Sequence, residues 1–139
     1  MRRTPSGDGL GTKTRGSERI WRPTRWFDIQ RSHMSNEIRG RFYFERTSNG
    51  HLLGEFSNRQ SDLIYTESAD LIGQSDGFMG NYSTTWQENG NPCHAELAIS
   101  NCPRNPRLLV IKWSRNGKPV FEGEGMFCDD ILIGDYQNV

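Results

Sequence analysis

Tight-turn dipeptides divide the sequence after residue 34 into short segments. They are Asn49-Gly50, Asp76-Gly77, Asn89-Gly90 and Asn116-Gly117. Asn, Asp and above all Gly adopt positive φ at low steric cost, as the tight turns of β-hairpins require. Between the turns, apolar and polar residues alternate with a period of two, which is typical of strands. The sequence therefore predicts a succession of β-hairpins and no helical bundle.

In each segment the residues of one parity are apolar or aromatic, and we assign them to the interior. In residues 38–44, for example, Phe42 and Phe44 share one face, while Arg39 and Arg41 share the other. The predicted strands are 38–44, 52–56, 78–86, 95–99, 109–113, 121–127 and 132–136, with weaker ones at 62–67 and 70–74. The chain should therefore contain eight or nine strands.

The hydrophobic parity also predicts which residues face each other across three hairpins. Register follows the buried face, because a slip of one residue moves every side chain to the opposite face. We expect a bulged three-residue turn at Asn49-Gly50 and at Asn116-Gly117, and a two-residue turn at Asp76-Gly77. The predicted cross-strand pairs are Phe42–Phe56 and Phe44–Gly54, Leu71–Tyr82 and Ser75–Phe78, and Ile111–Phe121 and Trp113–Pro119.

Glycines recur at positions that the alternation assigns to the interior. They are Gly40, Gly54, Gly80, Gly123, Gly125 and Gly134. Glycine weakens a flat strand, but it permits sharp coiling and leaves room for a neighbouring aromatic ring. Both properties help a sheet to close on itself, and consecutive hairpins favour up-and-down connectivity. We therefore predict an all-β fold, an antiparallel up-and-down β-barrel, over a two-layer sandwich or an open curled sheet.

The first 33 residues differ from the rest of the chain in charge and in pattern. Residues 1–33 carry eight Lys/Arg and three Asp/Glu, whereas residues 34–139 carry nine and fourteen. The first segment shows neither strand nor helix periodicity, and such a segment buries too little apolar surface to offset its ordering entropy. We predict a basic, disordered tail over 1–33 and a single barrel domain over 34–139. The tail is interpreted as a non-native extension, with a targeting segment or a functional arm as alternatives.

Composition restricts the partners and the compartment. The formal net charge is zero, which argues against a nucleic-acid footprint. The sequence holds no run of about 18 apolar residues, so we expect no membrane span. Three cysteines and no secretory signal pattern favour free thiols in a reducing compartment, which we take as the cytoplasm. No pair of cysteines or histidines has metal-ligand spacing, so we predict no metal site and no cofactor.

The later strands resemble those of calycin-type barrels, the lipocalin and avidin-like group. The resemblance rests on a pattern of glycines and aromatic residues over about residues 38–138. It comprises Gly80-x-Tyr82-x-x-x-Trp86, Ile111-x-Trp113, Phe121-x-Gly123-x-Gly125 and Leu132-x-Gly134-x-Tyr136. The lipocalin Gly-x-Trp signature is absent, since Arg41 and Phe42 follow Gly40. The resemblance thus implies the barrel and, by analogy, a ligand pocket at its mouth.

Two functions follow from the predicted faces of the strands. Inward aromatic residues with polar tips suit a small, partly apolar ligand, as in a lipocalin-like carrier or sensor. The ligand-binding candidates are Tyr82, Trp86, Trp113 and Tyr136. The outward face of the last three strands is apolar enough to require a cover, which favours self-association as a homo-oligomer. The interface candidates are Leu108, Val110, Val120, Met126, Ile131 and Ile133.

Enzymatic function is the least favoured hypothesis. The candidate acids and bases are His51, His94, Glu122, Glu124, Asp129 and Asp130. They form no recognisable motif for a nucleophile, a phosphate-binding loop or a metal. We therefore expect a protein that is not an enzyme, with a hydrolase or isomerase site at the barrel mouth as the less favoured alternative.

Overall fold

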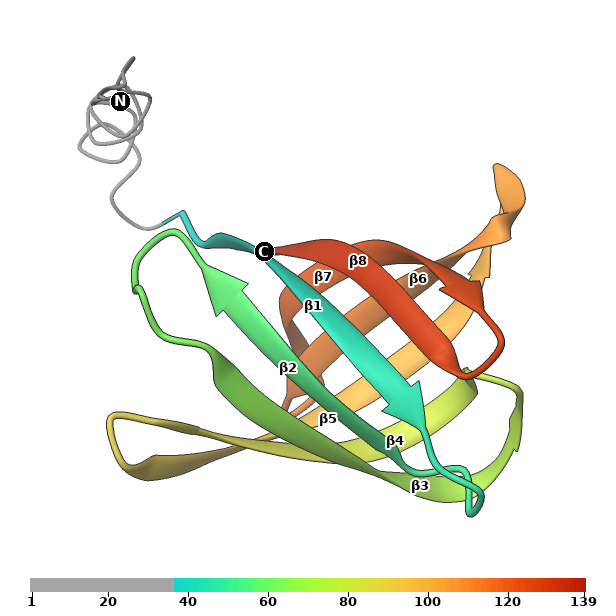
Figure 1. Cartoon of the computed structure of the whole chain (residues 1–139), viewed down its shortest axis with the longest axis horizontal. Helices are drawn as coiled ribbons and strands as arrows, with labels where there is room; N and C mark the ends of the chain where they lie inside the picture. The colour runs from blue at the N-terminus through green and yellow to red at the C-terminus, as the bar shows by residue number, and fades with distance from the viewer. Residues whose placement is uncertain (1–36) are drawn as a thin grey trace, which may run out of the picture. The chain divides into compact units, whose positions relative to one another are not determined.

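The computed structural model describes residues 37–139, which form a closed barrel (Figure 1). Its strands are β1 (Arg39–Arg46), β2 (Leu52–Asn58), β3 (Tyr65–Asp76), β4 (Met79–Glu88), β5 (Asn91–Cys102), β6 (Asn105–Arg115), β7 (Lys118–Cys128) and β8 (Ile131–Asn138). Each strand pairs antiparallel with the next, and β8 pairs with β1 to close the barrel. The predicted antiparallel up-and-down barrel is confirmed, with eight strands in the described part of the chain. The predicted tail over 1–33 and its boundary lie outside the described residues.

The pairing of β1 with β2 matches the predicted alternation, whereas the extent of β3 does not. Phe42 pairs with Phe56 and Phe44 with Gly54, as predicted, and Gly50 takes a φ of 85° in the connecting loop. In place of the two weak segments expected at 62–67 and 70–74, the structure has one continuous strand, β3, and residues 62–64 precede it.

The hairpin between β6 and β7 differs from the prediction. Asn116 and Gly117 both have positive φ, 52° and 79°, and form a two-residue turn between the paired residues Arg115 and Lys118. The expected Trp113–Pro119 and Ile111–Phe121 pairs are wrong: Trp113 pairs with Phe121 and Ile111 with Gly123. The register shifts between Trp113 and Ser114, where Val120 is the extra residue. Core still faces core, but the bulge that achieves this lies inside the strands rather than in the turn.

The hairpin between β3 and β4 confirms one predicted pair and corrects another. Leu71 pairs with Tyr82, as predicted. The Ser75–Phe78 pair is wrong, because Asp76 pairs with Met79 and the register shifts between Ile72 and Asp76. Gly73, with a φ of 75°, lies in that irregular stretch and gives it a conformation that other residues rarely adopt.

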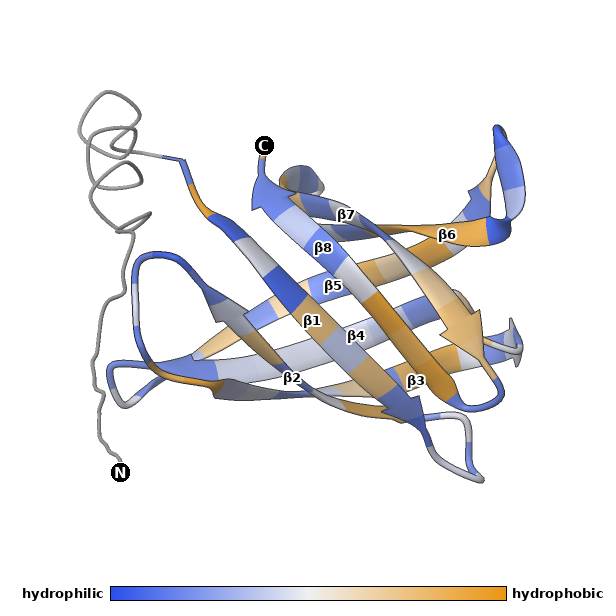
Figure 2. Cartoon of the chain, turned by 45° about the horizontal axis from the view of Figure 1, so that its top comes forward, coloured by the Kyte–Doolittle hydropathy of each residue, from blue (hydrophilic) through white to orange (hydrophobic). Residues whose placement is uncertain are grey.

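Alternate residues of most strands fill the interior, whereas β7 contributes only Gly125 to the buried set. The buried apolar side chains are Phe42, Phe44, Leu52, Ala69, Phe78, Tyr82, Trp86, Ala95, Leu97, Ile99, Cys102, Leu109, Ile111, Trp113, Leu132 and Tyr136. Figure 2 shows the resulting alternation of hydropathy along the strands, with more continuous hydrophobic stretches in the first half of β8 and on β6. The core therefore occupies the barrel lumen, as the strand parity predicts.

Interior glycines make room for Tyr136 of β8. Gly40 of β1 and Gly123 of β7 are its two cross-strand partners, in register on either side. A Cβ atom on Gly40 would lie 2.6 Å from Tyr136 Cε1 and 2.1 Å from the carbonyl oxygen of Ser57. Real Cβ atoms do not approach other atoms so closely, so this ring position depends on glycine at residue 40.

The two ends of the barrel carry different side chains. We define the aromatic end as the end of the barrel where β2, β4, β6 and β8 finish. It also carries the chain segment 59–64 and the Asn89-Gly90 and Asn116-Gly117 turns. At the opposite end Phe78 is buried, and its ring centroid lies 6.2 Å from that of Phe127, which is half exposed.

Within residues 37–139 we find no helix of the length and apolarity needed to cross a membrane.

Candidate functional site

A buried carboxyl group lies inside the barrel at the aromatic end. Glu67 of β3 is only 5 % exposed. Its Oε2 accepts a hydrogen bond of 2.5 Å from the Thr84 hydroxyl and one of 2.9 Å from the Trp113 indole Nε1. Burying a carboxyl group among apolar side chains is costly unless it is hydrogen-bonded or neutral. Glu67 is therefore the interior residue that most needs a functional explanation.

Strand parity places Glu67 inward. Residues 65, 67, 69 and 71 of β3 alternate with exposed ones, and Ala69 is fully buried. Glu67 pairs with Trp86 of β4, whose ring also lies inside. Glu67 is absent from the predicted site residues because the two weak strands predicted for β3 hide its parity. One continuous alternation from Tyr65 to Leu71 is the signal that would have found it.

Burial raises the pKa of the Glu67 carboxyl, and the hydrogen bonds from Thr84 and Trp113 oppose this shift without cancelling it. The Thr84 hydroxyl also lies 3.2 Å from the carbonyl oxygen of Ser68. A hydroxyl has one proton to donate and lone pairs to accept with. Thr84 can therefore donate to an ionised Glu67, or accept from a protonated Glu67 while it donates to Ser68. The site accommodates either protonation state without leaving Thr84 unpaired.

Glu67 borders a small cavity of about 40 Å³. Its lining consists of Ile38, Phe42, Phe56, Asn58, Glu67, Trp86, Glu88, Trp113, Phe121 and Tyr136. This space is small, so only a small group fits beside Glu67. It extends from the buried Glu67 to Glu88, which is exposed. A ligand entering here would place only its head beside Glu67.

Aromatic rings surround this cavity in edge-to-face and tilted pairs. The Trp113 ring centroid lies 5.6 Å from that of Phe42 and 5.9 Å from that of Tyr136. Phe56 lies edge-on to Trp86 at 6.3 Å and to Tyr136 at 6.1 Å. These separations are within the 4.5–7 Å typical of attractive aromatic pairs. The rings therefore support one another and hold the shape of the cavity.

Polar groups ring the mouth of the cavity. The Trp86 indole donates a hydrogen bond of 3.0 Å to Glu88, and the guanidinium carbon of Arg115 lies 5.5 Å from the centre of the Trp86 ring. Asn58 donates a hydrogen bond of 3.3 Å to the Tyr136 hydroxyl. Burial raises the pKa of Tyr136, so this group stays a neutral phenol at ordinary pH.

The structure brings together three of the four predicted ligand-binding residues. Trp86, Trp113 and Tyr136 all line the cavity. Tyr82 does not line it; its side chain is fully buried and its hydroxyl donates a hydrogen bond of 2.7 Å to the carbonyl oxygen of Phe78. That bond ties Tyr82 to the residue that fills the opposite end. The ligand-binding role of all four residues remains a prediction.

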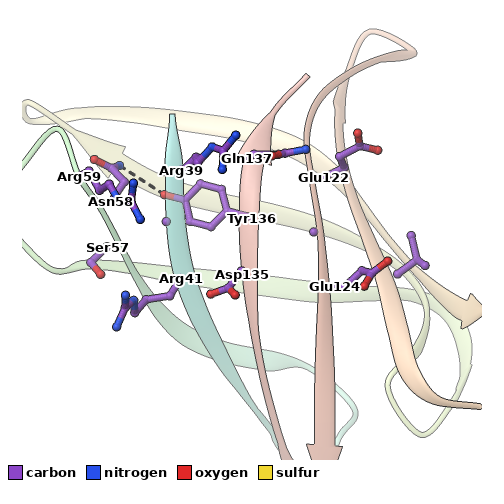
Figure 3. Close-up of a pocket in the computed structure, with 13 residues that line it drawn as sticks. Arg39, Arg41, Ser57, Asn58, Arg59, Glu122, Glu124, Asp135, Tyr136 and Gln137 are labelled. Carbon is purple, nitrogen blue, oxygen red and sulfur yellow. Dashed lines mark hydrogen bonds between the residues drawn. The ribbon is translucent and has the colours of Figure 1, made fainter. Parts of the chain in front are cut away.

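A groove of about 710 Å³ lies on the outer wall (Figure 3). Arginines 39, 41 and 59 line it from β1 and the end of β2, and Glu122, Glu124 and Asp135 line it from β7 and β8. Three cations and three carboxylates cancel in formal charge, and Arg104 forms an ion pair with Glu124. The lining itself is formally neutral, and Arg104 adds one cation beside it. Asn58 and Tyr136 line both this groove and the interior cavity.

A third hollow, of about 210 Å³, lies at the opposite end beside Phe78 and Phe127. Across it, Arg46 donates a hydrogen bond of 2.9 Å to the carbonyl oxygen of Gly77 and lies 4.0 Å from Asp130. These contacts join the loops of that end to each other. They are typical of structural loop contacts rather than of a ligand site.

The predicted acids and bases are dispersed over the barrel. His51 accepts a hydrogen bond from the Leu71 amide at Nδ1, and His94 lies 3.2 Å from the Thr85 hydroxyl. Glu122 and Glu124 lie in the outer groove, and Asp129 and Asp130 form the turn between β7 and β8. Within residues 37–139, no three His, Cys, Asp or Glu side chains are grouped as a metal site would require. Cys93, Cys102 and Cys128 are free thiols.

The predicted interface residues fall into two groups. Met126 and Ile133 are 64 % and 59 % exposed, and Ile131 is also exposed. Leu108, Val110 and Val120 are half-buried. Leu108 pairs with Met126, and Met126 pairs with Ile133, so these three lie side by side across β6, β7 and β8. Their role in self-association remains a prediction.

Comparison with known proteins gives no match to any family model, curated protein or solved structure. The eight-stranded closed barrel fits a calycin-like barrel in general. Membership of the lipocalin or avidin-like group, a cytoplasmic location and a homodimer remain predictions.

Proposed function

We propose that this protein is a non-enzymatic binding domain, a carrier or sensor that holds the head of a small ligand in the cavity at its aromatic end. The observation that supports this most strongly is the Glu67 carboxyl at the base of an aromatic-lined cavity. Titratable groups with a strongly altered pKa in a cavity are commonly functional. The aromatic side chains supply apolar contact, and the carboxyl orients the ligand.

Stability alone does not explain a glutamate at this position. Replacing buried ionisable groups by apolar ones of similar volume is often neutral or stabilising. The Trp113 indole and the Thr84 hydroxyl need an acceptor here, but a neutral amide of the same size would supply one without an ionisable group. A carboxyl group kept in this place therefore favours a role in binding.

Binding fits the geometry better than catalysis. The hydroxyl nearest to Glu67 belongs to Thr84, which is fully buried and hydrogen-bonded within the barrel. A nucleophile must reach its substrate, and Thr84 does not reach the surface. Glu88, the second carboxyl of the lining, lies at the mouth and accepts a hydrogen bond from the Trp86 indole. Both carboxyl groups thus position aromatic rings and a ligand head.

Three probes that share an aromatic tail test this proposal: 2-phenylethylamine, 2-phenylethanol and phenylacetate. We expect at least one to shift the indole N–H NMR signals of Trp86 and Trp113 saturably. Ile38→Trp replaces a lining side chain by a larger, aromatic one that fills the cavity, and it should abolish the shift. Met79→Trp at the opposite end should leave the shift unchanged. If none of the three probes moves these signals, the proposed function is wrong.

A second candidate function is self-association, and the row from Leu108 through Met126 to Ile133 favours it. Tyr43 of β1 extends the row beyond Ile133 and is also exposed. Two side chains in the row are more than half exposed, and monomers rarely present such aligned apolar groups to water. The neighbouring row, Arg41, Asp135 and Glu124, carries both charge signs, so a second copy can meet it with opposite charges facing. Sedimentation of the purified chain at micromolar concentrations measures the assembly directly.

A further inference from the structure

We infer that the ligand head held beside Glu67 is a primary ammonium group, as in an alkyl or arylalkyl amine. This inference rests on the proposed binding function and names the chemical class of the ligand. Charge, ring chemistry and cavity volume at the aromatic end point to it independently.

The charge of the lining favours a cation. Its ten residues include the two carboxyl groups of Glu67 and Glu88 and contain no Lys or Arg. The outer groove differs, because arginines there match carboxylates in number. An ammonium group that enters the cavity would meet Glu67 at the base and pass Glu88 at the mouth. An anionic head would meet both carboxyl groups with no cation in the lining to offset them.

The rings of the lining favour the same class. Phe42, Phe56, Trp86, Trp113, Phe121 and Tyr136 all border the cavity. Aromatic faces attract cations through the ring quadrupole, Trp most strongly, and aromatic cages commonly recognise ammonium ligands. Arg115 already lies over the Trp86 ring at 5.5 Å, so one ring of the set holds a cation in this way. A ligand ammonium would extend the same interaction into the cavity.

Cavity volume distinguishes a primary ammonium from a quaternary one. The space between the lining side chains is small, about 40 Å³. A primary ammonium is close to a water molecule in size, and it offers three hydrogen-bond donors. A trimethylammonium group is several times larger and has no N–H to donate. The buried carboxyl also favours a head group that donates, because the hydrogen bonds from Thr84 and Trp113 both end on Oε2 of Glu67 and leave Oε1 for the ligand.

Ammonium binding should couple to the proton on Glu67. A bound cation favours the ionised carboxyl and opposes the effect of burial. The other charged or titratable groups around the cavity are Glu88, Tyr136, Tyr65 and Arg115. Of these, Glu88 is exposed, and burial raises the pKa of Tyr136, which keeps it a neutral phenol. Affinity for the amine should therefore rise with pH as Glu67 loses its proton.

The test compares the affinities of full-length protein for 2-phenylethylamine, 2-phenylethanol, phenylacetate and the N,N,N-trimethyl derivative of the amine. Titrations at pH 7 follow the Trp86 and Trp113 indole signals. We expect the amine to bind at least ten-fold more tightly than the other three. Glu67→Gln, which keeps the size of the side chain, should weaken amine binding at least ten-fold. Glu96→Gln on the outer face of β5 should not change it.

The outcomes separate this inference from the proposed function. If the alcohol or phenylacetate shifts the same signals with equal or higher affinity than the amine, the ammonium assignment is wrong and the cavity still binds a ligand. Equal affinity for the amine in Glu67→Gln and wild type also overturns the assignment. If no probe moves the signals, both proposals fail. Wild-type chemical shifts outside the site, retained in Glu67→Gln, show that the variant is folded.

Discussion

The indole Nε1 of Trp113 on β6 donates a 2.9 Å hydrogen bond to Oε2 of Glu67 on β3, which links two strands that are not neighbours in the barrel. The bond crosses the lumen and fixes the indole ring and the carboxyl relative to each other. Because the Trp113 ring also contacts Phe42 and Tyr136, the position of Glu67 is coupled to the aromatic lining. The carboxyl and the rings therefore behave as one preorganised site.

Glu67→Gln should change how stability depends on pH. Burial raises the folded-state pKa of Glu67, so the folded protein holds a proton that the unfolded chain loses above its ordinary glutamate pKa of about 4.3. The stability from this proton is fully present below that value and is lost as the pH rises through the folded pKa. Gln cannot ionise, so the variant should gain stability relative to wild type as pH rises. Urea unfolding at pH 4 to 8 measures the difference.

Glu96→Gln is the matched control for this measurement, since Glu96 is exposed on the outer wall. Its free energy of unfolding should stay parallel to that of wild type across the pH range. A Glu67→Gln curve that also runs parallel to wild type would show that Glu67 is ionised in the folded protein with an ordinary pKa.

Thr84→Val should destabilise the barrel by about 1–3 kcal/mol, because a buried carboxyl loses a hydrogen-bond donor while the side-chain volume is retained. Thr84→Val should cost less stability in the Glu67→Gln background, because a buried neutral amide loses less free energy than a carboxylate when it loses a hydrogen-bond donor. A double-mutant cycle of the two changes measures this coupling by urea unfolding. If the two single effects add, the ionisable carboxyl of Glu67 does not make this hydrogen bond stronger than a neutral amide would.

Gly40→Ala should destabilise the protein by about 1–3 kcal/mol, as overpacking typically does. The new methyl group would meet the Ser57 carbonyl oxygen and the Tyr136 ring, and a backbone oxygen cannot move aside as a side chain can. Thermal unfolding gives the magnitude. Ser100→Ala, an exposed position on β5, is the control and should unfold like wild type. Unchanged stability in Gly40→Ala would mean that Tyr136 does not need the space beside residue 40.

The sequence predicts a cross-strand pair correctly where the inward and outward parity alone sets the register. It fails where a local bulge shifts the register. Parity correctly places Phe42 opposite Phe56, because a slip would expose both rings. Parity does not locate a bulge, however. A bulge at Val120 and a three-residue turn at Asn116-Gly117 both bring inward residues of β6 and β7 opposite each other. Alternation alone does not show which of the two irregularities occurs. The closed barrel was predictable for the same reason as the Phe42–Phe56 pair: the inward glycines and rings recur on most of the strands.

The candidate site was predictable only in part. Trp86, Trp113 and Tyr136 are inward by parity and meet at one end because their strands finish there. Glu67 was missed because the predicted strands 62–67 and 70–74 interrupt the alternation that runs through it, and because a charged residue at an inward position does not fit that alternation. Such contradictions are expected at functional sites, where local rules give way to binding.

Replacing Met126 and Ile133 by Lys should prevent self-association, because both lie in the exposed row on β7 and β8. Neither side chain contributes to the core, so the barrel should stay folded by circular dichroism. Sedimentation equilibrium should show a dimer for wild type and a monomer for the double variant. Asn81→Lys, exposed on β4, is the control for added charge. A wild-type chain that sediments as a monomer at high micromolar concentration would contradict self-association.

The pKa of Glu67 in the presence and absence of an amine tests the central claim most directly. The side-chain carboxyl ¹³C shift of Glu67, followed over pH with and without saturating 2-phenylethylamine, reports it. We predict a pKa above the ordinary glutamate value in the free protein and a lower one with the amine bound. A Glu67 pKa that is the same with and without the amine would contradict the account.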